Sequence, residues 1–218
     1  MVWRLHPSPH NIRSIVFDLD GTLYVSPGIA RDIERAAEEL VSATRGVTAA
    51  EGRSLIRAAR TRLAEILEEE PTLTRTCLEL GIEVDELHRA FQAQVRPERY
   101  LATDPVLGAL LDSLRERCDL YVYTNNSLPL ARKIIALLGV EEQFRSLYTI
   151  EFCRLPKPDP EALRRVLEDI GGPPESFLFV GDREQVDLKP ANALGIPTIL
   201  VAETADLLQV HKLLGIIP

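Results

Sequence analysis

The sequence lacks the features that characterise disulfide-rich, zinc-binding, secreted and membrane-spanning proteins. Only three of its 218 residues are cysteine, and they are odd in number and too widely spaced for a disulfide framework or a zinc site. No apolar run is long enough to span a membrane, and residues 1–13 lack the apolar core of a signal peptide. We therefore expect a protein of the reducing cytoplasm with no membrane partner.

An excess of positive charge is also missing. Lys and Arg number 25 against 33 Asp and Glu, so the net charge is −8, which argues against binding to nucleic acid polymers but not to a single nucleotide. The histidines show no metal-ligand spacing, and we assign none of them to catalysis; they are His6, His10, His88 and His211. Hydrophobic content of 45% and charged content of 27% are ordinary for a soluble globular chain.

Helical patterns fill the region from Ile29 to about Tyr100. Apolar residues fall on one helical stripe at the start of this region, and Gly46 is placed to end the first helix. Thr48 and Glu51 match a capping box that opens a second long helix. Two shorter helical patterns follow, so we predict a four-helix insertion over residues 26–103.

The remainder of the chain, residues 1–25 and 104–218, alternates apolar strands with helical patterns. The strands are predicted after residue 13 and at 120–124, 146–152 (more weakly), 176–182 and 197–201. Such alternation predicts an α/β fold with a doubly wound parallel sheet, interrupted after its first strand by the helical insertion. In sheets of this kind the ligand lies at the carboxyl ends of the strands.

Two carboxylates follow the first strand directly. Asp18 and Asp20 stand two residues apart, so their side chains point the same way in an extended chain. Gly21 then lets the backbone turn or approach a ligand closely. This stretch is either a solvated acidic turn or a metal-assisted acid–base site, and the other strand ends decide between the two.

The other strand ends carry matching chemistry. Thr124 and Asn125 can bind an anionic oxygen, and Lys157 stands between two prolines that stiffen the backbone around it. Asp182 and Asp187 follow a later apolar strand. Several carboxylates, a lysine and a Thr/Asn pair are thus expected at one sheet edge, and oxygen ligands without histidine or cysteine favour Mg²⁺ over zinc.

Four short motifs, in order, resemble those of the haloacid dehalogenase (HAD) superfamily. They are "DLDGT" at residues 18–22, "TNN" at 124–126, "KP" at 157–158 and "GDREQVD" at 181–187. The resemblance covers the whole α/β part and implies a Rossmann-like core, with the helical insertion as the cap that this superfamily carries between its first and second motifs.

The resemblance also implies roles. Asp18 would be the nucleophile that forms an aspartyl-phosphate, and Asp20 the general acid and then the base. Mg²⁺ would be held by Asp18, the backbone carbonyl of Asp20 and Asp182, while Asp187 supports the metal shell or holds Lys157.

The phosphoryl group would be bound by Thr124, the backbone of Asn125 and Lys157. Phosphoryl transfer needs such positioning and charge neutralisation above all.

The second aspartate favours one reaction within the superfamily. Members that dehalogenate lack an acid at the position of Asp20, because a halide leaving group needs no proton, so a phosphatase is favoured. Arg183 departs from the pattern, which frequently has serine there. The motif surroundings look most like the pyrimidine 5′-nucleotidase branch, in which Tyr24 either stacks on a base or packs at the domain hinge.

We therefore expect a magnesium-dependent phosphatase acting on a small phosphorylated metabolite, with a nucleoside 5′-monophosphate as one candidate. Two alternatives stay open: a phosphomutase of the same superfamily, and a non-catalytic phosphate-binding regulatory module. The sequence does not determine the physiological substrate or the oligomeric state.

Overall fold

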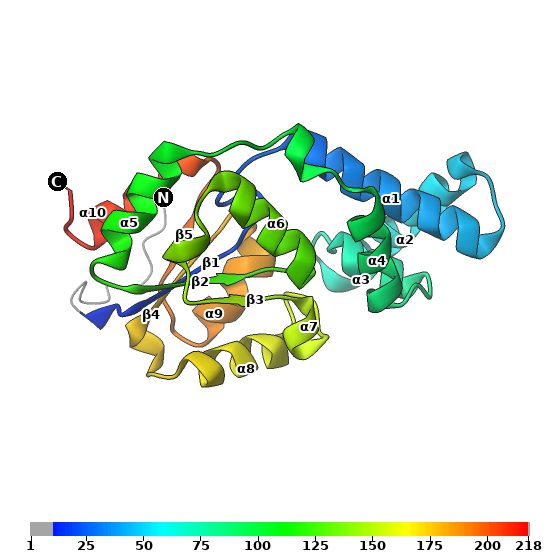
Figure 1. Cartoon of the computed structure of the whole chain (residues 1–218). Coiled ribbons are helices and arrows are strands. Elements are labelled where there is room, and N and C mark those ends of the chain that lie inside the picture. The colour runs from blue at the N-terminus through cyan, green and yellow to red at the C-terminus, as the bar shows by residue number, and fades with distance from the viewer. Residues whose placement is uncertain (1–10, 218) are drawn as a thin grey trace. The chain divides into compact units, whose positions relative to one another are not determined.

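The computed structural model describes residues 11–217 (Figure 1). His6, His10 and most of the N-terminal stretch considered above lie outside the described residues. Over the part described, none of the helices combines the length and the apolarity needed to cross a membrane. The chain divides into two compact units, of which one is Ser26–Tyr100 and the other comprises the flanking segments. The predicted insertion, residues 26–103, extends slightly past the C-terminal end of the unit Ser26–Tyr100.

A five-stranded parallel sheet is the centre of the α/β unit. In the order β3-β2-β1-β4-β5, its strands are Ser146–Tyr148, Asp119–Tyr123, Ser14–Phe17, Phe177–Gly181 and Thr198–Leu200. The central strand β1 is buried along its whole length, as expected for a strand covered on both faces. The predicted α/β fold with a parallel sheet is confirmed.

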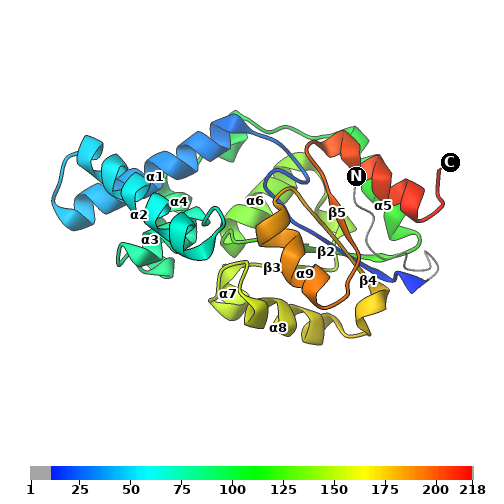
Figure 2. The same ribbon diagram turned by 180° about the vertical axis from the view of Figure 1, so that it is seen from behind.

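Helices cover both faces of this sheet (Figures 1 and 2). Because side chains alternate along a strand, Val16 faces one way and Phe17 the other. The Val16 face packs against α8 (Pro160–Ile170) and α9 (Lys189–Ala193) in one apolar cluster. The opposite face lies under α5 (Pro105–Arg115) and α6 (Leu128–Leu138). A last helix, α10, spans Leu208–Leu213.

The helical unit contains four α-helices, as the sequence predicted. They are α1 (Pro27–Arg45), α2 (Ala49–Leu67), α3 (Leu73–Glu79) and α4 (Val84–Gln94). Gly46 ends α1 with a φ of 64°, and Thr48 and Glu51 form the predicted capping box of α2. Tyr100 lies close to Gly28, since a Cβ there would be 2.4 Å from its ring and the ring would have to move to admit a side chain.

One predicted strand is only partly correct. The stretch 146–152 forms β3 over Ser146–Tyr148 and then turns into the short helix α7 (Ile150–Cys153). The reason is tertiary, because the N–H of Ile150 donates to the carbonyl of Asn126 and the carboxylate of Glu151 accepts the N–H of Leu128 at the start of α6. A pattern of apolar residues alone cannot reveal such partners.

The strand order reverses at β1. The chain proceeds from β1 to β2 and β3 on one side and then crosses to β4 and β5 on the other. The loops that follow β1, β2 and β4 therefore meet at the carboxyl edge of the sheet, where ligands of open α/β folds bind.

Candidate active site

Asp18 directly follows β1 at this edge. Its N–H donates to the carbonyl of Val180 on the neighbouring strand, at 2.8 Å, so the sheet itself fixes its backbone. The side chain is 10% exposed and accepts from the hydroxyl of Thr22, at 3.3 Å, across the tight turn that the strand enters. This predicted nucleophile is held on a rigid element and still reaches the surface.

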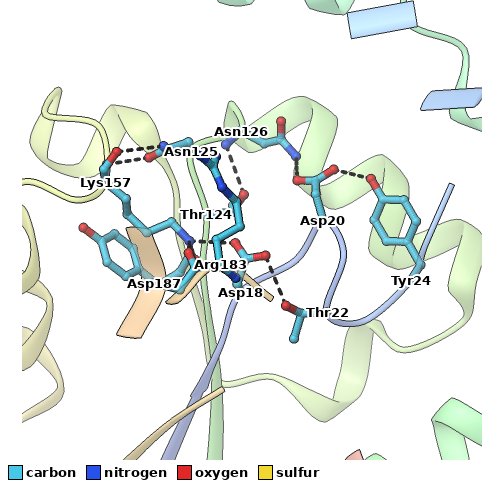
Figure 3. A network of polar contacts seen from close by, with 11 residues as sticks. Asp18, Asp20, Thr22, Tyr24, Thr124, Asn125, Asn126, Lys157, Arg183 and Asp187 are labelled. Carbon is cyan, nitrogen blue, oxygen red and sulfur yellow. Dashed lines mark hydrogen bonds and ion pairs between the residues drawn. The ribbon is translucent and has the colours of Figure 1, made fainter. Parts of the chain in front are cut away.

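Lys157 lies against Asp18 (Figure 3). Its ammonium donates to Oδ1 of Asp18 and Oδ1 of Asp187, both at 2.6 Å, and to the carbonyl of Tyr123 at 2.9 Å. Its side chain is only 4% exposed, and burial opposes its charge, but the two carboxylates outweigh this effect and raise the pKa of Lys157. The lysine is therefore a permanent cation beside the predicted nucleophile.

The backbone of Lys157 is held by Asn125. The side-chain oxygen of Asn125 accepts the N–H of Lys157, at 2.6 Å, and its amide donates to the carbonyl of the same residue, at 3.2 Å. The peptide bond between Lys157 and Pro158 is cis. The amide of Asn125 thus positions the lysine, while Thr124 beside it is buried, with its hydroxyl oxygen accepting the N–H of Asn126.

Asp182 and Asp187 approach the same point from the end of β4. Two glycines make room for them: a Cβ at Gly21, which has a φ of +89°, would lie 2.3 Å from Oδ2 of Asp182, and one at Gly181 would lie 2.5 Å from Cβ of Asp187. Asp187 lies in a single π-helical turn, and its Oδ2 accepts the N–H of Arg183 at 3.0 Å. Its two oxygens thus bind one backbone donor and Lys157.

Asp20 faces different partners. Tyr24 donates its hydroxyl hydrogen bond to Oδ1, and Nδ2 of Asn126 donates to Oδ2 at 2.5 Å (Figure 3). Burial raises the pKa of Asp20, although both of these hydrogen bonds lower it. Tyr24 is only 5% exposed, so it does not present its ring as a platform for a base.

The site holds more negative charge than its lysine can balance. One ammonium faces Asp18, Asp20, Asp182 and Asp187, and burial together with the neighbouring carboxylates raises the pKa of Asp18 against the pull of Lys157. Burial, reinforced by the charge of Asp187, raises the pKa of Asp182 to about 6. A further cation would offset this excess negative charge.

The donor set fits a hard divalent cation. One carboxylate oxygen from each of Asp18, Asp182 and Asp187 lies within 4.8 Å of the others. Among the described residues, no donor reaches the buried Oδ1 of Asp182, so this oxygen is available for a ligand. Oxygen donors of this type suit Mg²⁺.

The structure brings all the predicted site residues to one edge. They are Asp18, Asp20, Thr124, Asn125, Lys157, Asp182 and Asp187. The sequence reasoning did not foresee that Tyr24 and Asn126 bind Asp20, or that the carbonyl of Tyr123 accepts from Lys157. Asn126 lies inside the second motif, which was the one available signal. His211 is buried away from solvent, and its ring bonds to the hydroxyl of Ser113.

Known proteins similar to this chain include phosphatases. A phosphoglycolate phosphatase of Salmonella typhimurium is 28% identical over 204 residues, covering 87% of this chain and 81% of the relative. A phosphoglycolate phosphatase of Pectobacterium atrosepticum is 28% identical over 194 residues, with 86% and 79% covered.

Solved structures share the fold. A HAD phosphatase from Thermococcus onnurineus superposes with a TM-score of 0.58 at 20% identity, covering 94% of this chain and 98% of its own. An L-2-haloacid dehalogenase from Xanthobacter autotrophicus gives 0.52 at 20% identity, with 88% and 78% covered. At this level of sequence identity, the structural similarity establishes only a shared fold, and that fold occurs in both phosphatases and dehalogenases.

A match to a known protein family establishes the superfamily to which this chain belongs. The family described as haloacid dehalogenase-like hydrolase matches residues 12–195, which include all four motifs and both ends of the helical insertion. The predictions of superfamily and of a hydrolase are confirmed, and the phosphatases among its relatives agree with a phosphoric monoester hydrolase. The chain belongs to the haloacid dehalogenase-like hydrolase family.

Proposed function

We propose that this protein is a magnesium-dependent phosphatase that hydrolyses a small phosphate monoester through an aspartyl-phosphate intermediate. The observation that carries the proposal is the pairing of two differently held carboxylates at one edge. Asp18 lies against a buried ammonium, as a nucleophile must to attack an anionic phosphate, while Asp20 is held apart by Tyr24 and Asn126. A dehalogenase would need only the first of them.

The reaction has two balanced steps. An oxygen of Asp18 attacks phosphorus, the bond from phosphorus to the leaving oxygen breaks, and the proton of Asp20 passes to that oxygen. Water then attacks the phosphorus of the aspartyl-phosphate, gives its proton to Asp20, and releases inorganic phosphate as the bond to Asp18 breaks. Both residues return to their starting states.

The other residues bind and orient the phosphoryl group. Lys157 offsets its charge, and the Thr124 hydroxyl can donate to one of its oxygens. Mg²⁺, bound by Asp18 and Asp182 with support from Asp187, would supply additional positive charge at the phosphoryl oxygens.

Phosphoglycolate is the first substrate to examine, because the two relatives described above are phosphoglycolate phosphatases. Nucleoside 5′-monophosphates come second. The sequence argument for them included stacking on Tyr24, and the burial of this ring and its hydrogen bond to Asp20 remove that support.

The decisive test is phosphate release with and without Mg²⁺ by wild type and Asp18→Asn. The panel contains phosphoglycolate, nucleoside monophosphates, sugar phosphates and an aryl phosphate. Asp112→Asn is the matched control, because it makes the same change at an exposed position of α5. We expect magnesium-dependent release by wild type and the control, and only the blank rate from Asp18→Asn.

A second readout examines the intermediate. Acid-quenched wild-type protein should carry one phosphoryl group on the peptide that contains Asp18, detected by mass spectrometry. Wild-type protein that releases phosphate from nothing in the panel would overturn the proposal. Isomerised sugar phosphate without free phosphate would identify a phosphomutase instead.

A further inference from the structure

Both carboxylate oxygens of Asp20 are held by side chains of other residues. Tyr24, at the end of the turn after β1, donates its hydroxyl to Oδ1, and Asn126, from the loop after β2, donates its amide to Oδ2 (Figure 3). Asp18 is held by Lys157 and Thr22 instead. The two catalytic carboxylates therefore have separate sets of supporting residues.

Tyr24 and Asn126 are fixed by the fold. Tyr24 is 5% exposed and Asn126 is 7% exposed, so both residues are buried. The turn that presents Tyr24 is closed by a hydrogen bond from the N–H of Gly21 to the carbonyl of Tyr24, at 2.9 Å, and Asn126 is anchored through its own N–H to the hydroxyl of Thr124. Two rigid donors thus define the plane of one carboxyl group.

The orientation of this plane depends on outside support, because an aspartate side chain does not fix the plane of its own carboxyl group. The torsion about the Cβ–Cγ bond is broad and roughly two-fold, so an unsupported carboxyl group samples many orientations. A carboxylate offers about four lone-pair sites, and the two donors occupy only two of them. The remaining sites can carry the proton and direct it at the leaving oxygen.

We propose that Tyr24 and Asn126 are positioning residues that fix the carboxyl plane of Asp20 for proton transfer to the leaving oxygen. The inference rests on the proposed phosphatase function. It gives Tyr24 a role other than base stacking or hinge packing, and it makes the pair a determinant of which leaving groups the enzyme tolerates. Alkoxides, which need the proton most, depend on the pair, whereas stable phenolates do not.

The test is a leaving-group series. Wild type, Tyr24→Phe and Asn126→Ala are compared by kcat/KM on an alkyl phosphate, phenyl phosphate and 2,4-dinitrophenyl phosphate. We expect each variant to lose about 10-fold to 100-fold on the alkyl phosphate and no more than about twofold on the dinitrophenyl ester, because acid catalysis follows the basicity of the leaving oxygen.

A matched control and a double variant test whether Tyr24 affects the reaction by positioning Asp20. Tyr148→Phe also removes the hydroxyl of a buried tyrosine that donates to an aspartate, in this case Asp169 at 2.7 Å, and should show no change in leaving-group dependence. In an Asp20→Asn background, assayed on the dinitrophenyl ester and phenyl phosphate, Tyr24→Phe should add no further loss.

The outcomes separate this inference from the proposed function. A loss in Tyr24→Phe and Asn126→Ala that is equal for every leaving group, or that persists undiminished in the Asp20→Asn background, overturns the inference while the phosphatase stands. A wild-type enzyme that hydrolyses no ester of the series or of the substrate panel overturns both.

Discussion

Replacing Lys157 by methionine removes the buried ammonium that pairs with two carboxylates of the site, while keeping a long, unbranched side chain. The ammonium donates to Asp18, Asp187 and the carbonyl of Tyr123. All three side chains of the ion pairs are at most 10% exposed, so water cannot replace the lost donor without rearrangement.

The magnitude follows from this burial. Breaking a buried ion pair by removing one partner costs about 3–5 kcal/mol, because the other charge is left uncompensated. Here two carboxylates lose their shared partner, so we expect Lys157→Met to lower the free energy of unfolding by about 3–5 kcal/mol at neutral pH. Changing Asp187 to asparagine in the same protein removes one of these charges and should recover about 1–3 kcal/mol.

Urea unfolding followed by circular dichroism measures these differences. Lys133→Met, at an exposed position of α6, makes the same substitution and should change stability by no more than about 0.5 kcal/mol. A loss below about 1 kcal/mol in Lys157→Met, or a double variant less stable than the single one, would refute the view that Lys157 balances these carboxylates.

Three further predictions concern the metal, the turn and the thiols. Mg²⁺ at a hundred times its dissociation constant should stabilise the fold by about 2.7 kcal/mol and raise Tm by about 5–10 °C, and Asp182→Asn should abolish most of the shift in a thermal melt. Gly21→Ala should lower the free energy of unfolding by about 1–3 kcal/mol in urea, since its Cβ would meet Asp182 and its φ is +89°; wild-type stability would contradict this. Burial raises the pKa of Cys77 to about 12 and of Cys118 to about 11. A thiol reagent should therefore label only the partly exposed Cys153 quickly in folded protein. Rapid labelling of all three cysteines would show that Cys77 and Cys118 are not buried.

Much of this protein can be inferred from its sequence because the relevant signals are local. The alternation of apolar strands with helical patterns predicts a parallel sheet, and the capping box at Thr48 and the glycine at position 46 mark helix boundaries by backbone chemistry alone. The topology of a parallel sheet brings the carboxyl ends of its strands to one edge. The carboxylates that follow β1 and β4 in the sequence are therefore expected to lie close together there.

Other features depend on partners that are distant in sequence. The helical turn at Ile150 exists because Asn126 and Leu128 engage this segment from another loop, and the apolar pattern gave no sign of it. Asn125 likewise bonds to the backbone of Lys157, 32 residues away.

The sequence determined which chemical groups this site contains, because strand and motif order place them at a common edge. Only the tertiary structure decided how each group is held: Lys157 between Asp18 and Asp187, and Asp20 between Tyr24 and Asn126. The physical reason is that hydrogen-bond partners and burial are set by packing between segments, so they are properties of the folded arrangement and not of any local stretch of chain.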